Sequence, residues 1–312
     1  MQMFRKPTKQ IAQGDRAGIC VTQFDPKKME RGVVCTPGFL PTLYGGVVRV
    51  NNIPYYKGRC VNKAKFHITV GHETVMGKLQ FFGCPPENKE GEVSSEQFNV
   101  DTEYSFHEEL HVKKKVSASE EQSTDNQQQF VIVEFDHPIV GRADSLIIGS
   151  RLDTDINLNA CRLAFHGRIV MPFLVKEYAV SSLPLIKIFK WKQKEGTVER
   201  MSDAYTVIVK SLFKKETNLA LFTNMKVTLS TGEQGLIEGS FGQSGKIKVR
   251  VPNGLNETTM ERLSTTKKGK NKQVSTADSA AGSGSSETKE PIKVLLEFKK
   301  FIYDISHKMV QS

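Results

Sequence analysis

The sequence has no long apolar run, little helical periodicity and few cysteines, and each absence excludes a class of protein. No stretch reaches the ~18 apolar residues of a membrane span, so we expect no membrane partner. The segment from Met1 to Pro7 has no apolar core, so it does not resemble a secretion signal. The cysteines show no C-x-x-C spacing, which argues against a zinc site or a disulfide framework and indicates free thiols in a reducing compartment. They are Cys20, Cys35, Cys60, Cys84 and Cys161.

Positive charge is concentrated in the later part of the chain. The 312 residues are 38% hydrophobic and 25% charged, ordinary values for a globular protein of two or three domains. The net charge is +10, and residues 180–312 contain 22 Lys and Arg against 13 Asp and Glu. A local surplus of cations favours a polyanionic partner, because each phosphate contact releases condensed counterions. Nucleic acid is the favoured partner, and a basic surface without a ligand is the alternative.

Short segments of alternating or β-branched residues dominate the chain, and Gly, Pro, Asn and Asp bound them. Several short strands separated by turn signals indicate β-barrels or sandwiches rather than an α/β sheet. We therefore predict an all-β fold of tandem β-barrel domains. The expected strands include residues 17–22, 46–50, 130–135, 185–191 and 246–251.

Two low-complexity stretches interrupt this pattern. Residues 85–128 contain 11 Asp and Glu against 4 Lys and few large apolar residues, which indicates a mobile surface insert. Residues 264–291 are rich in Lys, Ser, Thr and Gly and indicate a disordered loop, after which strand character returns at 294–298. With boundaries near 38 and 182, the predicted units are 1–37, 38–182 and 183–312.

One pentapeptide in the acidic insert matches the H-E-x-x-H pattern of zinc proteases. That chemistry needs a stable helix, so that His107 and His111 bind one metal ion while Glu108 acts as general base. The insert offers no long apolar face on which such a helix could dock. We favour a chance match and keep the metalloprotease as an alternative.

Two further segments resemble nucleotide-binding motifs and depart from them at decisive positions. In residues 240–247, Ser240 replaces the first glycine of a phosphate-binding loop, and Ile247 stands where Ser or Thr would bind magnesium. Alternation over 246–251 predicts a strand instead of a helix, so residues 242–245 are interpreted as a hairpin turn. Residues 62–65 (Asn-Lys-Ala-Lys) lack the acid of N-K-x-D. We expect no metal site and no GTP binding by this chain alone.

Two predicted strands place rows of cations on one face. Successive side chains alternate across a strand, so the apolar residues between the cations fill the opposite face. Such rows suit contacts with an RNA backbone, and an ordinary solvated strand face is the alternative. The candidate RNA-binding residues are Lys190, Lys192 and Lys194, the neighbouring Lys210, Lys214 and Lys215, and Lys246, Lys248 and Arg250.

Longer strings of residues resemble a known family. Residues 3–7 (Met-Phe-Arg-Lys-Pro), 14–19 (Gly-Asp-Arg-Ala-Gly-Ile) and 30–34 (Glu-Arg-Gly-Val-Val) are similar to the second half of the domain-two barrel in translational GTPases of the elongation factor Tu class. Residues 64–77, 149–153 and 161–167 resemble domain three of the eukaryotic selenocysteine-specific elongation factors. Residues 212–218, 230–249 and 307–312 resemble domain four of that family.

The resemblance implies a role in translation. This family delivers selenocysteyl-tRNA to the ribosome at recoded UGA codons, together with an RNA stem-loop in selenoprotein messages and the protein that binds it. The resemblance implies a truncated domain two over 1–37, domain three over 38–182 and domain four over 183–312. GTP and magnesium belong to a GTPase domain that this sequence lacks, so we expect no catalysis and no cofactor here. A cytoplasmic location is expected, with the nucleus as a second one.

The resemblance also assigns roles to individual residues. Arg16 matches the arginine of the family's aminoacyl pocket, where a guanidinium would favour an anionic selenolate over a neutral serine hydroxyl. An ion pair with Asp15 or Asp25 is the alternative for Arg16. Domain three contacts tRNA in this class, with His67, His72, Arg151 and Arg162 as candidates. A protein-interaction scaffold that uses the acidic insert is a third interpretation of the whole chain.

Overall fold

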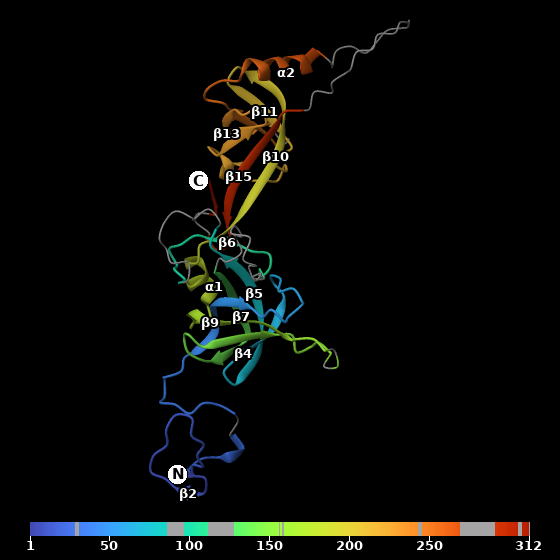
Figure 1. Cartoon of the computed structure of the whole chain (residues 1–312). Coiled ribbons are helices and arrows are strands. Elements are labelled where there is room, and N and C mark those ends of the chain that lie inside the picture. The colour runs from blue at the N-terminus through green and yellow to red at the C-terminus, as the bar shows by residue number, and fades with distance from the viewer. Residues whose placement is uncertain are drawn as a thin grey trace.

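The computed structural model describes residues 1–28, 31–85, 97–111, 128–155, 157, 159–242, 245–268, 291–304 and 308–311. An N-terminal segment, a first β-barrel and a second β-barrel follow one another along the length of the molecule (Figure 1). The two barrels are called barrel one and barrel two below. No helix within the described ranges is both long and apolar enough to cross a membrane.

Barrel one is a closed ring of antiparallel strands. Its order is β4 (Lys65–Val70), β5 (Glu73–Gly83), β7 (Gln129–Val140), β3 (Thr42–Asn52), β9 (Leu163–Phe173) and β8 (Leu146–Ser150), and β8 pairs again with β4. Alternate residues point inward, and Phe66, Phe81 and Phe165 fill the interior. Gly167 has no side chain because a Cβ there would lie 2.3 Å from the carbonyl oxygen of Arg49 on the adjacent strand.

Barrel two repeats this closure with different strands. The ring runs β10 (Ile188–Asp203), β11 (Thr206–Lys210), β14 (Lys246–Arg250), β13 (Gln234–Phe241), β12 (Lys226–Leu229) and β15 (Lys293–Phe301), and β15 returns to β10. The 3₁₀ helix η4 (Leu219–Phe222) and α2 (Glu257–Lys268) pack against the barrel, and β16 (Met309–Val310) extends β15. The tandem all-β architecture predicted from the sequence is confirmed.

A short strand connects the two barrels. β6 (Tyr104–Phe106) pairs antiparallel with β5 of barrel one and parallel with β10 of barrel two. The chain passes between the barrels over residues 174–187, which include α1 (Tyr178–Ser181) and the 3₁₀ helix η3 (Leu183–Leu185). A separate apolar core lies at this junction and contains Phe82, Tyr104, Phe130, Phe173 and Ile188 among its buried residues.

The acidic insert is more ordered than the sequence indicates. The prediction of a mobile insert over 85–128 is wrong for residues 97–111, because Phe98, Tyr104 and Leu110 pack into the barrels although the surrounding residues are polar. Residues 86–96 and 112–127 lie outside the described ranges. The predicted loop 264–291 also begins too early, since α2 continues to Lys268 with Leu263 buried against barrel two. Residues 269–290 are not described.

The N-terminal segment contains little regular structure. β1 (Gln2–Met3) and β2 (Lys6–Pro7) form a minimal hairpin, and η1 (Pro26–Lys28) is a single 3₁₀ turn. The predicted strand 17–22 is wrong, because only Gly18 forms an isolated bridge, with Gln2, and no sheet in the described residues extends it. A lone strand is not stable in water. Phe4 and Val34 stay largely exposed in this segment.

Candidate nucleic-acid interface

The cations of β14 share one face, as predicted, but acidic residues stand among them. The intervening residues Ile247 and Val249 are fully buried in barrel two. Lys246 Nζ lies 2.8 Å from a carboxylate oxygen of Glu199, and Glu238 lies 3.1 Å from Lys248 and 3.8 Å from Arg250. The excess charge of this face is therefore small. The sequence could not indicate this, because Glu199 and Glu238 come from other strands of the ring.

The cations of β10 share a strand face but lie in different environments. The ammonium of Lys190 lies 4.6 Å above the ring of Phe106 and pairs with Glu108. Lys192 is exposed and forms no ion pair within the described ranges. Lys300 stands directly opposite Lys190 in the antiparallel register, so β15 adds a lysine to the same face.

Lys194 is the centre of a group of like charges. Its ammonium lies 4.6 Å above the ring of Phe213 and 5.4 Å above that of Phe222, at one end of the core of barrel two. Burial lowers the pKa of Lys194, and the neighbouring charges of Lys214 and Lys300 lower it further. The electrostatic potential at Lys194 is therefore positive. Among the described residues, no carboxylate contributes to the pKa shift of Lys194.

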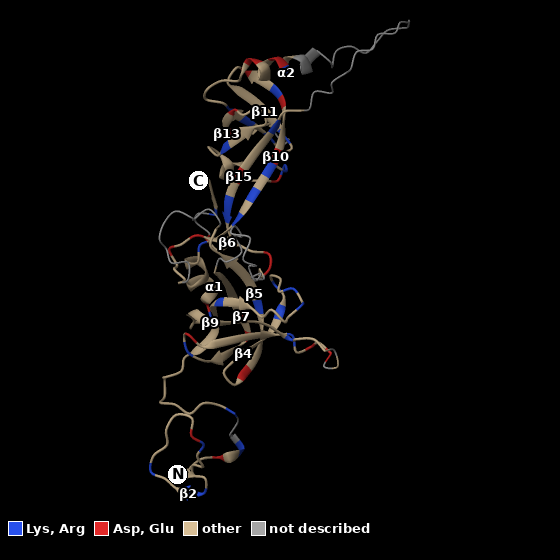
Figure 2. Cartoon of the chain, in the orientation of Figure 1, with Lys and Arg blue, Asp and Glu red and all other residues tan. Residues whose placement is uncertain are grey.

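The cluster of Lys192, Lys194, Lys214 and Lys300 is called the lysine cluster below. Cationic residues recur along β10 and β15 where these strands approach β6 (Figure 2). The remaining candidates, Lys210 and Lys215, are exposed at the end of β11 and in the turn after it. Lys300 was missed in the sequence because its position beside Lys190 depends on the register of β10 with β15.

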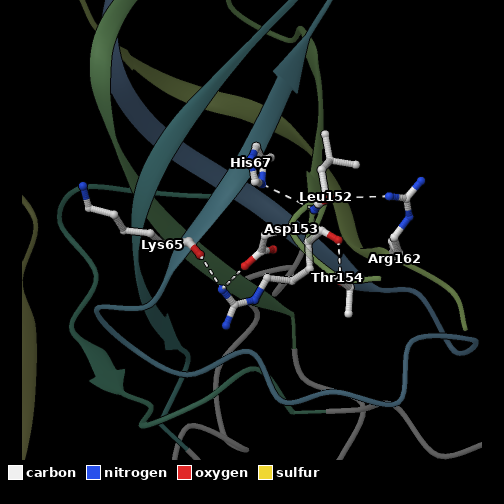
Figure 3. Close-up of polar contacts among 7 residues, drawn as sticks. Lys65, His67, Leu152, Asp153, Thr154 and Arg162 are labelled. Carbon is white, nitrogen blue, oxygen red and sulfur yellow. Dashed lines mark hydrogen bonds and ion pairs between the residues drawn. The ribbon is translucent and has the colours of Figure 1, made fainter. Parts of the chain in front are cut away.

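Three of the four candidates in barrel one meet at a single loop that follows β8 (Figure 3). The guanidinium of Arg151 donates to the carbonyl of Lys65 at 3.2 Å and lies 4.8 Å above the ring of Phe66. The backbone N–H of Leu152 donates to Nδ1 of His67, and Arg162 donates to the carbonyl of Leu152. These contacts hold the base of the loop. The fourth candidate, His72, lies apart from this loop and contacts Glu73.

The H-E-x-x-H segment is not a helix. β6 ends just before His107, whose ring stacks on that of His111 with centroids 4.5 Å apart. Glu108 pairs with Lys190, and Glu109 lies 2.7 Å from Arg59. Both carboxylates are therefore engaged in ion pairs at the surface. Across the described residues, no cluster of three or more His, Cys, Asp or Glu side chains could hold a metal ion.

The nucleotide-like motifs have structural roles. Phe241 pairs with Lys246, so β13 and β14 form the predicted hairpin, although Gln243 and Ser244 in its turn are not described. The side chain of Asn62 donates to the carbonyl of His107 and accepts from the backbone N–H of Phe81. Asn62 therefore fastens the β6 segment to barrel one.

Arg16 is exposed in the N-terminal segment. Its two alternative partners are used locally: Asp15 accepts from the backbone N–H of Ala12 at 2.7 Å, and Asp25 accepts from that of Lys27 at 3.0 Å. In the part of the chain that the structure describes, Arg16 forms no ion pair with either carboxylate.

Comparison with known proteins agrees with this arrangement of barrels. The family model "Selenocysteine-specific elongation factor, eukaryotes, 3rd domain" matches residues 47–167, and the model "eEFSec C-terminal RIFT domain" matches residues 184–308. The selenocysteine-specific elongation factor of Mus musculus is 43% identical to this chain over an alignment of 327 residues. The chain belongs to the eukaryotic selenocysteine-specific elongation factors. The match with the mouse protein covers the whole of this chain. The chain spans 56% of the length of the mouse protein.

Solved structures resemble the chain in fold. The translation elongation factor SelB from Methanococcus maripaludis in its apo form gives a TM-score of 0.53 at 16% identity, covering 96% of this chain and 52% of that one. The same factor in complex with the GTP analogue GppNHp gives 0.55 at 17% identity, covering 96% and 51%. At this level of identity the likeness concerns the fold alone.

Proposed function

We propose that this chain binds selenocysteine tRNA and the ribosome during selenocysteine incorporation. In this proposal the chain contributes RNA contacts rather than catalysis. The selenocysteine-insertion RNA element and its binding protein are the further partners we propose. Membership of the selenocysteine-specific elongation factors supports this role. Both nucleotide-like motifs have structural roles in the barrels. This supports the proposal that GTP and magnesium bind to other parts of such a factor and not to this chain.

The lysine cluster is the observation that carries the proposal. Burial lowers the pKa of Lys194 most, and the charges of Lys214 and Lys300 lower it further, so a like-charge repulsion acts on Lys194 from both lysines. An RNA phosphate placed among these cations would relieve the repulsion and release counterions. The cations of β14 already have carboxylate partners, so they have less to gain from a phosphate.

For Arg16 we propose the family's role in contacting the aminoacyl group. Its exposure leaves the guanidinium accessible, but a closed pocket would require further groups around it. This assignment therefore concerns the assembled factor, and tRNA binding through barrel two does not depend on it.

The test is binding of the 312-residue chain to selenocysteine tRNA and to an ordinary elongator tRNA across a salt series. Combined Lys192→Gln, Lys214→Gln and Lys300→Gln substitutions should weaken binding and reduce the slope of log affinity against log salt by about three, roughly one for each lost phosphate contact. The matched set Lys246→Gln, Lys248→Gln and Arg250→Gln should cause a smaller loss, because these cations are ion-paired.

Equal losses from the two sets would contradict the assignment of the lysine cluster as the main contact. Equal affinity of the unmodified chain for both tRNAs would contradict a selective role, and the basic surface would then supply only general attraction to RNA.

A further inference from the structure

Trp191 lies on the face of β10 that is opposite the lysine cluster. It is the only tryptophan of the chain and keeps 44% of its surface exposed. Phe189 meets it edge to face at 5.7 Å, and the ammonium of Lys299 lies 5.6 Å from the indole centroid. Lys299 is itself held by Glu103 at 2.7 Å. The indole is thus fixed by its neighbours while much of its surface remains open to solvent.

Two hollows border the indole on the outer surface of barrel two. One has a volume of about 320 Å³ and extends from Trp191 over Leu295 to Lys226 and Gln234. The other has a volume of about 370 Å³ and is lined by Trp191, Lys192, Gln193 and Glu297. Trp191 and Glu297 are common to both, so the indole stands between them as a shared wall.

The end of the chain shapes the first hollow. The side-chain amide of Gln311 donates to the carbonyls of Lys226 and Glu297 at 2.7 and 2.8 Å and accepts from the N–H of Lys226. Gln311 therefore forms a fixed wall. The amides of Gln193 and Gln234 make no side-chain hydrogen bond to any described residue and remain available to a ligand.

The chemistry of these hollows fits a nucleotide. Bases of every type stack on an aromatic face, and amide or carboxylate groups hydrogen-bond to base edges. Lys226 is exposed at the rim of the first hollow, and Lys192, whose side chain belongs to the opposite strand face, borders the second. A hydrophobic peptide anchor fits less well, because only Leu295 and Trp191 give the lining an apolar character.

We propose that Trp191 stacks an unpaired base of a bound RNA, while the lysine cluster on the other face of the same strands holds the backbone of the RNA. This inference rests on the proposed RNA-binding function and adds to it a preference for single-stranded or looped segments. A regular duplex keeps its bases inside the stack, so it could contact only the lysine cluster, through its phosphate backbone.

The single tryptophan allows a direct test with the full chain. Titration with an oligouridylate of about eight nucleotides should quench Trp191 fluorescence, whereas a stable blunt RNA duplex should bind with little quenching. Trp191→Ala should weaken binding of a labelled oligouridylate about 5- to 100-fold, and Trp191→Phe should retain part of the affinity. Tyr205→Ala, which removes another exposed aromatic residue of barrel two, should leave the affinity unchanged.

The outcomes separate this inference from the proposed function. RNA binding without quenching, and with full affinity in Trp191→Ala, would overturn the stacking site and leave the RNA-binding function intact. Quenching by an oligoglutamate peptide of the same charge but not by RNA would show that the site takes a protein ligand, and would also overturn the proposal. Failure of any RNA to bind would overturn both.

Discussion

Among single residues, His107 shows most clearly how its surroundings determine ionisation. Burial lowers its pKa to about 4, and the positive charge that His111 can carry acts in the same direction. Its Nδ1 atom is buried and has no hydrogen-bond partner among the described residues. A proton on this ring would therefore be poorly stabilised in the folded protein.

The low pKa of His107 predicts a loss of stability in mild acid. The ring is neutral in both states above its unfolded pKa of 6.5. As the pH falls from 6.5 towards 4, the unfolded chain takes up a proton that the folded chain does not. The folded state then loses up to about 3 kcal/mol. Urea unfolding across this range should show the loss in the wild type, and His107→Phe should remove most of it. Parallel pH profiles for the two proteins would contradict this assignment.

Among elements, α2 depends on a buried carboxylate in the turn between β12 and β13. Glu233 is 8% exposed and accepts from the hydroxyl of Thr259 at 2.6 Å and from the backbone N–H of Asn256 at 3.2 Å. The hydroxyl of Thr231 donates to its other oxygen. Burial alone would raise the pKa of Glu233, but these hydrogen bonds outweigh that effect and lower it.

Replacement of Glu233 by Gln should destabilise barrel two. An amide has only one acceptor oxygen and would place an NH₂ group against existing donors, a mismatch that costs about 1–3 kcal/mol. Urea unfolding at neutral pH would measure the change. Glu238→Gln, which breaks only exposed ion pairs of β13, should cost less than about 1 kcal/mol. A larger loss from Glu238→Gln than from Glu233→Gln would contradict this view of α2.

The elements that the sequence predicts are those with a strong local pattern. Apolar or alternating residues identify 46–50 and 130–135, which lie in β3 and β7, and 246–251, which exceeds β14 by one residue. The short strand β6 was missed because it has three residues and obtains its partners from two separate barrels. The helix α2 was missed because its sequence is mostly polar and few apolar residues dock it.

The candidate site was predictable by residue type but not by arrangement. Alternation placed Lys246, Lys248 and Arg250 on one face of a strand, as the structure confirms. Which of these cations are neutralised depends on Glu238 of the adjacent hairpin strand β13 and on Glu199 of the more distant strand β10, and therefore on how these strands are aligned. The register of β10 with β15 likewise brings Lys300 beside Lys190. Local patterns carry no information about such pairings.

For the whole molecule, the junction determines whether the barrels behave as one unit. The hydroxyl of Tyr303, which follows β15, donates to the side chain of Gln80 in barrel one at 2.9 Å. The backbone N–H of Tyr104 donates to the carbonyl of Lys187 at 2.9 Å. The ring of Tyr104 is 1% exposed and lies 5.2 Å from Phe82, which belongs to barrel one. Hydrogen bonds and apolar contacts therefore cross the junction together.

We expect the barrels to unfold as one cooperative unit and to separate when the junction core is emptied. Tyr104→Ala removes a buried aromatic ring, a change that costs about 3–5 kcal/mol. Trp191 fluorescence reports barrel two, while circular dichroism reports both barrels. The two unfolding curves should coincide in the wild type and diverge in Tyr104→Ala. Tyr104→Phe keeps the ring and loses the hydroxyl contacts, including those with Asn99, so its curves should still coincide. Coincident curves in Tyr104→Ala would mean that the contacts of Tyr303 and the strand pairing of β6 with β10 couple the barrels without this ring.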